Sequence, residues 1–328
     1  MKLLLKGVMP YYQVRRLFKS EFSDYEEHCM SQQSLREQEG FIPVEQGYRI
    51  WYRIVGGGAE SERVPLLMLH GGPGVPHDYL ENLAALASAD RRVIFYDQLG
   101  CGRSDKPDDT SLWQVPRFVE ELATVRRELG LERVHILGQS WGGMLAIEYA
   151  LTQPAGLVSL VLANTTSSIP MWIAEANRLR ADLPPEVNAI LLRHEEAGTT
   201  DDPAYEDAMM VFYARHVCRV LPMPENVQRS FETLSQPVYH TMNGPSEFHV
   251  IGTIKDWDRT ARLSEIHVPT LILSGKYDEA TPVINEILHR GIADSEWVLF
   301  EQSSHLAHVE EPELYMQTVQ AFLHNVER

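Results

Sequence analysis

One serine in the chain lies in the sequence pattern of an activated nucleophile. Residues 138–142 read GQSWG and match G-x-S-x-G. The apolar segment VHIL precedes this pattern, and a helical segment, MLAIEYALTQ, follows it. A serine at a sharp strand-to-helix turn has a strained backbone and needs small flanking residues, because bulk there would clash. The pattern therefore predicts that Ser140 is the nucleophile of an acyl-transfer reaction.

A serine hydroxyl needs a base to take its proton, and the base needs a carboxylate to orient it. In chains with this nucleophile turn, the acid follows the serine and the histidine comes last. Asp278 ends the apolar segment TLILSGKYD, and the carboxyl ends of buried strands are where open parallel sheets place their sites. His305 lies in the loop after the apolar segment WVLF. We predict Asp278 as the acid and His305 as the base.

Both positions have alternatives nearby. Asp256 and Asp258 compete for the role of the acid, but they lie in a segment without clear strands. His308 competes for the role of the base, but it falls toward a helix expected to start near Pro312, where a histidine is often structural. His305 is preferred because the base must reach back over the sheet edge from a loop.

Strand and helix patterns alternate along most of the chain. The continuous apolar runs at 64–74, 91–100 and 268–278 predict strands buried on both faces, as is typical of parallel sheets. Amphipathic segments at 116–130 and 312–327 predict helices. This order predicts an α/β fold with a mostly parallel, doubly wound sheet.

The alternation stops between residues 165 and 266, where helical stretches rich in Met, His and Pro replace it. We therefore predict a helical cap at 165–266, inserted between two parts of an α/β core at 41–164 and 267–328. Residues 1–40 are polar and show no clear period, so we expect an N-terminal extension outside the core. Met30 offers an alternative start of the chain.

Acyl transfer also needs N–H donors for the oxyanion of the tetrahedral intermediate. The backbone N–H of Trp141, directly after the nucleophile, is the first predicted donor. The turn HGGPG at 70–74 follows an earlier strand, and its adjacent glycines let the backbone approach a substrate closely. We predict Gly72 as the second donor.

The charge and cysteine content of the chain exclude several classes of binding partner and cofactor. The chain has 29 Lys and Arg against 46 Asp and Glu, a net charge of −17, which disfavours nucleic acids and anionic membrane surfaces. Its three cysteines, Cys29, Cys101 and Cys218, are far apart and odd in number, which argues against a disulfide framework. No zinc-type spacing and no apolar run of transmembrane length occurs. We expect a cytoplasmic enzyme without a metal or other cofactor.

The motifs together resemble a known family. HGGPG (70–74), DQLGCGRS (97–104) and GQSWGG (138–143), followed by Asp278 and His305, are similar to the proline iminopeptidase (prolyl aminopeptidase) family of α/β-hydrolases. The resemblance runs from about residue 41 to 325. It implies an α/β-hydrolase fold with an inserted helical cap. It also implies a serine aminopeptidase that releases an N-terminal residue, with proline preferred or among those accepted, from short peptides through an acyl-enzyme.

Two further segments resemble the branch that contains the tricorn-interacting aminopeptidase and amino-acid amidases. NGPSEF (243–248) resembles the segment whose glutamate binds the free α-amino group, which implies that role for Glu247. Glu279, directly after Asp278, matches a second such glutamate. Two carboxylates facing one ammonium would select a free N-terminus. An amino-acid amidase or esterase would use the same amine-binding site and stays open as the alternative.

The chain also departs from the family pattern. Leu99 stands where many members have arginine, which changes the loop beside the site. Cys101 lies in the same loop, and the resemblance suggests a packing role for it. Ser140 argues against epoxide hydrolases and dehalogenases, which use an aspartate there. A non-catalytic binding protein would be favoured by loss of a triad member, and none is lost.

Overall fold

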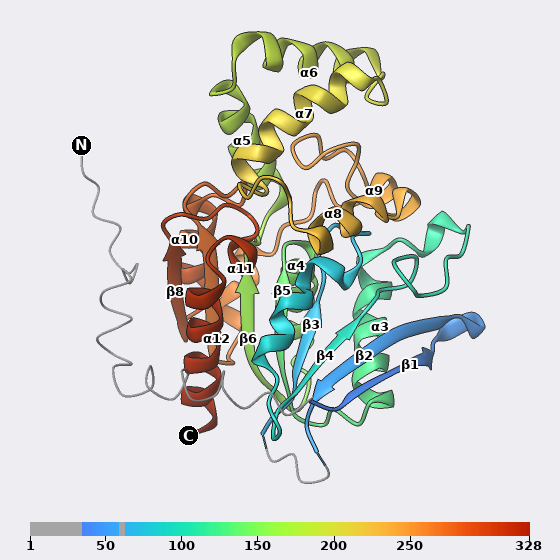
Figure 1. The fold of residues 1–328 in the computed structure, drawn as a ribbon, viewed down its shortest axis with the longest axis vertical. Helices are drawn as coiled ribbons and strands as arrows, with labels where there is room; N and C mark the ends of the chain where they lie inside the picture. The colour runs from blue at the N-terminus through green and yellow to red at the C-terminus, as the bar shows by residue number, and fades with distance from the viewer. Residues whose placement is uncertain (1–34, 59–62) are drawn as a thin grey trace.

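The computed structural model describes residues 35–58 and 63–328, which form one twisted sheet flanked by helices (Figure 1). The strands are β1 (Glu37–Pro43), β2 (Arg49–Gly56), β3 (Leu66–Leu69), β4 (Arg92–Tyr96), β5 (Val134–Gln139), β6 (Leu157–Ala163), β7 (Thr270–Gly275) and β8 (Ser295–Phe300). They are ordered β1-β2-β4-β3-β5-β6-β7-β8. The pairs β1/β2 and β2/β4 are antiparallel and all others are parallel. The predicted α/β fold with a mostly parallel sheet is confirmed.

Helices connect these strands and cover both faces of the sheet. Those outside the β6–β7 connection are η1 (Glu45–Gly47), η2 (His77–Leu86), η3 (Thr110–Leu112), α3 (Val115–Glu128), α4 (Trp141–Ala150), α10 (Pro282–Gly291), α11 (Ala307–Glu310) and α12 (Pro312–Glu327). The helix η2, which follows the turn after β3, is a 3-10 helix. None of the helices within residues 35–58 and 63–328 has the length and apolar character needed to span a bilayer.

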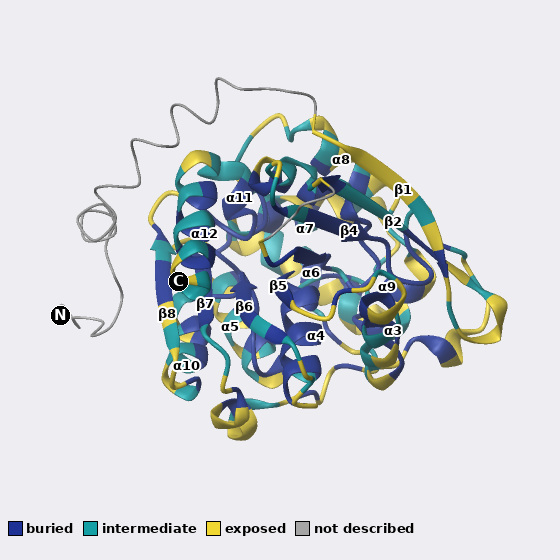
Figure 2. Cartoon of the chain, turned by 90° about the horizontal axis from the view of Figure 1, so that it is seen from below, coloured by how far each residue is buried: buried dark blue, intermediate teal, exposed yellow. Residues whose placement is uncertain are grey.

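Alternating side chains of the buried strands pack into two separate hydrophobic cores, one on each face of the sheet. Leu67 and Leu69 of β3 pack in one apolar cluster with residues of α3 and α4. Leu66 and Met68 of the same strand pack in a second cluster with residues of η2 and α12. Because successive side chains of a strand point to opposite faces, a continuous apolar run such as LLML fits only a sheet covered on both sides. Figure 2 shows these strands buried between the helices.

The sheet begins slightly earlier than the predicted core. Strand β1 starts at Glu37, and its residues pair in register with β2, Glu37 opposite Val55 and Pro43 opposite Arg49. Residues 37–40 are thus part of the sheet, although the predicted boundary lay at residue 41. This polar segment joins the sheet because it pairs with β2, and not because it is apolar. Residues 1–34 of the predicted extension lie outside the described residues.

The connection between β6 and β7 contains helices and no strand of the sheet. Its helices are α5 (Ile169–Ala181), α6 (Pro185–Ala197), α7 (Pro203–His216), α8 (Glu225–Glu232), α9 (Gln236–Met242) and η4 (Thr260–Glu265). In Figure 1, α5 to α9 lie beyond the carboxyl ends of the parallel strands. We call residues 165–266 the insertion. Its position means that any site at this end of the sheet is walled by both the insertion and the core.

The amino ends of the parallel strands are joined by one carboxylate. Glu327, at the end of α12, accepts hydrogen bonds from the Val64 backbone N–H (3.0 Å) and from both Arg91 Nη atoms (3.0 and 2.7 Å). Its Oε1 also lies 3.2 Å from His135 Nε2 on β5. Although burial opposes ionisation, these donors lower the pKa of Glu327 to about 2. At this end of the sheet, the negative charge of Glu327 is paired with the guanidinium of Arg91.

Candidate active site

Ser140 occupies the turn between β5 and α4, in a backbone conformation that serine rarely adopts (φ 56°, ψ −123°). The flanking glycines make this turn possible. A Cβ at Gly142 would lie 2.1 Å from the Leu69 carbonyl oxygen, and one at Gly138 would lie 2.2 Å from the Gly142 carbonyl oxygen. Such strained turns concentrate at functional sites, because the surrounding packing has to hold them. The turn presents Ser140 at the carboxyl edge of the sheet.

Asp278 and His305 meet at the same edge. His305 Nδ1 lies 2.7 Å from Asp278 Oδ1, which also accepts the Ala280 N–H at 2.8 Å. Asn164 donates to the other oxygen, Oδ2, at 2.6 Å and to the Ser304 carbonyl at 3.1 Å. Asp278 is 1% exposed and His305 is 5% exposed. An acceptor on Nδ1 places the ring proton there, so Nε2 is left to accept a proton.

Asn164 is a site residue that the sequence interpretation missed. It follows β6 directly, so the rule that sites lie at the carboxyl ends of parallel strands could have found it. Its positive φ of 49° is a conformation that asparagine tolerates better than most residues.

One pocket brings several of the predicted residues together. Ser140, His305, Gly72, Glu247 and Glu279 all line it. The Ser140 hydroxyl makes no hydrogen bond to any described residue, and it faces the same space as the His305 ring. The remaining walls are largely apolar, and they include Val75, Val217, Phe231 and Leu306. The structure therefore brings the predicted nucleophile, the predicted base and both glutamates to one pocket.

The two predicted oxyanion donors flank the nucleophile. Gly72 lines the pocket with φ 108°, and a Cβ there would lie 2.5 Å from the Gly74 nitrogen, so only glycine fits. Trp141 is the first residue of α4, and its side-chain Nε1 donates to Gln98 Oε1 at 2.9 Å. Neither the Gly72 nor the Trp141 backbone N–H donates to any described residue. Both donors are thus available to a ligand.

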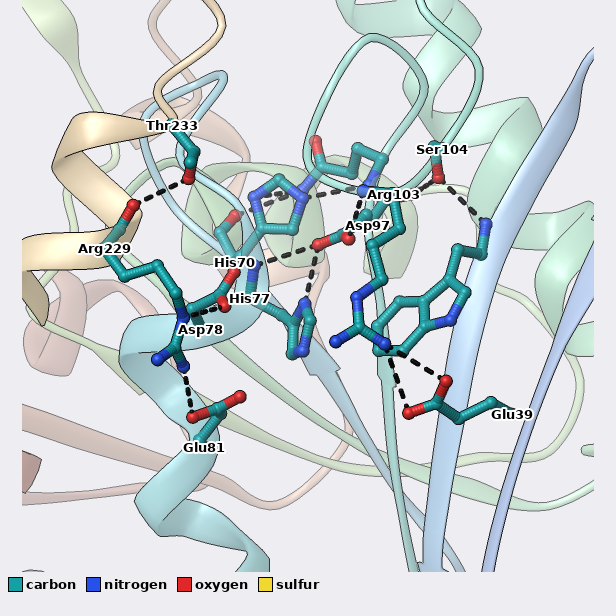
Figure 3. A network of polar contacts seen from close by, with 12 residues as sticks. Glu39, His70, His77, Asp78, Glu81, Asp97, Arg103, Ser104, Arg229 and Thr233 are labelled. Carbon is teal, nitrogen blue, oxygen red and sulfur yellow. Dashed lines mark hydrogen bonds and ion pairs between the residues drawn. The ribbon is translucent and has the colours of Figure 1, made fainter. Parts of the chain in front are cut away.

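A buried polar network supports the turn that carries Gly72 (Figure 3). Asp97 Oδ1 accepts from the His77 N–H (3.0 Å) and from His77 Nδ1 (2.8 Å), and its Oδ2 accepts from the Arg103 N–H (2.9 Å). The Gln98 N–H donates to His70 Nε2 at 2.9 Å. Burial lowers the pKa of His70 to about 4, so its ring stays neutral and keeps this acceptor. The network fixes the loop after β4 against the turn after β3.

Leu99, which departs from the family pattern, and Cys101 both lie inside this loop. The Leu99 side chain is fully buried, and its N–H points to both carboxylate oxygens of Glu121 at 3.3 Å. Cys101 is also fully buried, and burial raises the pKa of its thiol well above the ordinary value. Both side chains therefore fill the core under the site.

Glu247 and Glu279 form an unusual carboxylate pair. Glu279 is 0% exposed, and neither of its carboxylate oxygens has a hydrogen-bond partner among the described residues. Glu247 is half-buried and accepts the Tyr239 hydroxyl at 2.7 Å. Burial raises the pKa of both carboxyls, and the charges of Glu247 and Asp278 raise that of Glu279 further. The His305 Nε2 atom lies 3.8 Å from Glu279 Oε1 and is a cation only when protonated, so the carboxylate pair has no permanent cation beside it.

The rival residues lie elsewhere. His308 is fully buried, and its Nε2 lies 3.1 Å from the Tyr79 carbonyl, which requires the proton on Nε2. Burial lowers its pKa to about 4. Asp258 accepts from the Ser168 hydroxyl (2.9 Å) and the Thr260 N–H (2.8 Å), and Asp256 pairs with its neighbour Lys255. None of the three lines the pocket.

The insertion is bonded directly to the catalytic loops. The His216 carbonyl, at the end of α7, accepts the N–H groups of both Glu279 (3.3 Å) and His305 (3.2 Å). Nearby, Glu310 accepts the Arg219 N–H at 2.5 Å and the Ser304 hydroxyl at 2.7 Å. The insertion therefore helps to place residues of the core.

Comparisons with known proteins agree with this geometry. The alpha/beta hydrolase fold family matches residues 64–312. The chain is 43% identical to a proline iminopeptidase of Saccharolobus solfataricus, over 87% of this chain and 94% of that protein. It is 42% identical to a proline iminopeptidase of Heyndrickxia coagulans, over 88% of this chain and 99% of that one.

Solved structures give the same result. The protein VinJ superposes with a TM-score of 0.85 at 43% identity, covering 88% of this chain and 99% of that chain. The proline iminopeptidase of Mycobacterium smegmatis superposes with a TM-score of 0.81 at 42% identity, covering 88% and 98%. The resemblance inferred from the motifs is confirmed: this chain belongs to the proline iminopeptidase family of α/β hydrolases.

Proposed function

We propose that this protein is a serine aminopeptidase that releases an N-terminal residue, proline among those accepted, from short peptides. Its similarity to several proteins named proline iminopeptidase supports this reaction. The observation that carries the proposal is the Glu279 carboxylate, which is buried, has no hydrogen-bond partner among the described residues, and shares one pocket with Ser140 and Glu247. A protonated α-amine is the cation that this pair lacks.

In the proposed mechanism, His305 Nε2 takes the Ser140 proton while Oγ attacks the first carbonyl carbon of the peptide. The Gly72 and Trp141 N–H groups stabilise the oxyanion. Collapse breaks the peptide bond, and the imidazolium returns the proton to the leaving amine. A water molecule, deprotonated by His305, then hydrolyses the acyl-enzyme ester and frees the amino acid. Asp278 keeps the ring in the reactive tautomer throughout.

The same arrangement explains where cleavage would occur. If both glutamates hold the α-amine, the carbonyl one residue away is the one that reaches Ser140. The apolar walls formed by Val75, Val217 and Phe231 suit a small apolar side chain such as proline. Internal peptide bonds lack the charged amine and would leave Glu279 unpaired, which penalises them.

The test is a set of kcat/KM values for proline, alanine and leucine p-nitroanilides, N-acetylproline p-nitroanilide, prolinamide and p-nitrophenyl acetate. We expect cleavage of the free-amine anilides, loss of cleavage on acetylation, and retained turnover of the neutral ester. Equal rates on free and acetylated anilides would refute the amine site. Turnover of prolinamide without turnover of the free-amine anilides would instead identify an amidase.

A further inference from the structure

Three separate turns must be held in register for the proposed reaction. They are the turn after β3 with Gly72, the turn after β5 with Ser140, and the loop after β8 with His305. One continuous chain of hydrogen bonds joins all three. The Gly71 N–H donates to the Tyr79 hydroxyl at 2.7 Å, and that hydroxyl donates to Gln139 Oε1 at 2.6 Å. Gln139 Nε2 then donates to the His305 carbonyl at 3.1 Å.

The direction of each bond in this chain is fixed by the chemistry of its members. A backbone N–H can only donate, so Tyr79 accepts from Gly71 and its single proton goes to Gln139. The amide oxygen of Gln139 is then the acceptor, and its NH₂ group faces the His305 carbonyl. Tyr79 is 4% exposed and Gln139 is 2% exposed. Hydrogen bonds shielded from water in this way are stronger, and breaking one leaves buried polar groups unpaired.

Packing makes the same link rigid. A Cβ at Gly71 would lie 2.9 Å from Gln139 Oε1, 3.0 Å from the Tyr79 hydroxyl and 3.0 Å from Ser140 Cβ. The turn that carries the oxyanion donor therefore touches the nucleophile turn directly. Tyr79 is fixed at its other end as well, because its carbonyl lies 3.1 Å from His308 Nε2. His308, the rejected candidate for the base, thereby supports this link.

We propose that Tyr79 and Gln139 are positioning residues, which set the oxyanion turn and the His305 backbone relative to Ser140. The proposal rests on the proposed serine mechanism. It assigns a role to the Gln of the GQSWG motif and to a tyrosine on η2, a helix that supplies no reacting group. Both side chains act through the backbone of Gly71 and His305.

Tyr79→Phe removes one oxygen atom and leaves the Gly71 N–H and Gln139 Oε1 without partners. The oxyanion turn and His305 would shift relative to Ser140, and their positions matter most in the transition state. We therefore expect kcat to fall about 10- to 100-fold with little change in KM. The matched control is Tyr315→Phe. Tyr315 is also fully buried, but its hydroxyl has no hydrogen-bond partner among the described residues, so kcat should equal that of the parent.

Gln139→Glu gives a second, independent signature. An ionised carboxylate can still accept from Tyr79, but it repels the His305 carbonyl. A protonated one can donate to that carbonyl. The titratable groups that share the pocket wall are Tyr79, His305, Glu247 and Glu279. We expect the kcat of this variant to fall as the pH rises, over a range in which the parent keeps its activity. The control is Gln153→Glu, since Gln153 also donates to a carbonyl, that of Glu265 (2.7 Å), but on the exposed surface.

Two readouts separate this proposal from the proposed function. The rate of Ser140 labelling by a fluorophosphonate and the hydrolysis of p-nitrophenyl acetate need the triad and oxyanion donors, but not the amine pocket. Both rates should fall in Tyr79→Phe and Gln139→Glu, even if the free-amine anilides prove to be poor substrates. Parent-like labelling rates and kcat in both variants would overturn the positioning role. A parent enzyme that is not labelled at Ser140 would instead overturn the serine mechanism.

Discussion

Glu279, which is buried, and Glu327, which is partly buried, lie at opposite ends of one sheet, and the surroundings of their two carboxylates are opposite. Glu327 accepts hydrogen bonds from a backbone N–H and an arginine, and its pKa is lowered to about 2. Glu279 has no hydrogen-bond partner among the described residues, and its pKa is raised well above the ordinary value. At the amino end of the sheet the carboxylate is thus held by several donors, whereas at the carboxyl end a buried carboxylate is left without a hydrogen bond from the described residues. Functional sites commonly cost stability in this manner.

The largest expected effect tests whether the chemistry lies wholly at the carboxyl end. Ser140→Ala should lower kcat by about 10⁴-fold or more, because one member of the triad is lost. The fold should be retained, since Ser140 Oγ has no hydrogen bond to lose within the described chain. The measurement is kcat on proline p-nitroanilide, together with mass-spectrometric mapping of a fluorophosphonate adduct to Ser140. Full activity in this variant would place the chemistry elsewhere.

Glu279→Gln should have two opposite effects, a loss of activity on free-amine substrates and a gain of stability. Losing one partner of a buried charge pair costs about 2–5 kcal/mol, so kcat/KM on free-amine anilides should fall from about 30-fold to several thousand-fold. Hydrolysis of p-nitrophenyl acetate should change little.

The same substitution should stabilise the protein. Because the pKa of Glu279 is raised in the folded state, its ionisation weakens the fold as the pH rises through that value. Gln cannot ionise, so the Tm gain of the variant should increase from acidic to neutral pH. A Tm below that of the parent at neutral pH would contradict the unpaired-charge interpretation.

His308→Ala tests the comparison within the carboxyl end, since it removes a buried histidine that does not line the pocket. Its loss leaves a cavity and an unpaired Tyr79 carbonyl, and should cost about 2 kcal/mol of stability. The drop in kcat should stay well under the roughly 10²-fold effect of losing a general base. His305→Ala, measured beside it, should be the inactive variant. The reverse outcome would exchange the roles of the two histidines.

Glu327→Gln should have the smallest effect on activity, with kcat and KM unchanged. It should lower the free energy of unfolding by about 1–3 kcal/mol, because charge-assisted bonds to Arg91 are weakened. Since the pKa of Glu327 is depressed, the parent loses this stabilisation as the pH falls from about 4.5 toward 2. Chemical denaturation across that range should show the two proteins converging at low pH. A constant difference would mean that the charge is not responsible.

Local patterns predicted the sheet well, because buried parallel strands carry continuous apolar runs. The runs at 64–74 and 268–278 contain β3 and β7, and this part of the prediction is confirmed. Strand β1 was not predicted because its sequence, EQEGFIP, is polar. Its strand conformation depends on pairing with the neighbouring strand β2.

Motifs likewise indicated Ser140, His305 and the two glutamates, which line one pocket, and Asp278, which contacts His305. Their catalytic and binding roles stay predictions. The supporting residues Asn164, Tyr79 and Gln139 carry no chemistry of their own. Their importance arises from hydrogen bonds between segments far apart in the chain, which no local pattern encodes.

The bonds from the His216 carbonyl to Glu279 and His305 have a consequence for how such enzymes diverge. A carbonyl is present whatever side chain stands at that position, so substitutions in the insertion leave this connection intact. Val217, directly after α7, and Ser230 and Phe231 of α8 line the pocket, so they can change and admit new N-terminal residues while His305 keeps its place. Natural selection can act on substrate range and on reaction rate through separate parts of the chain.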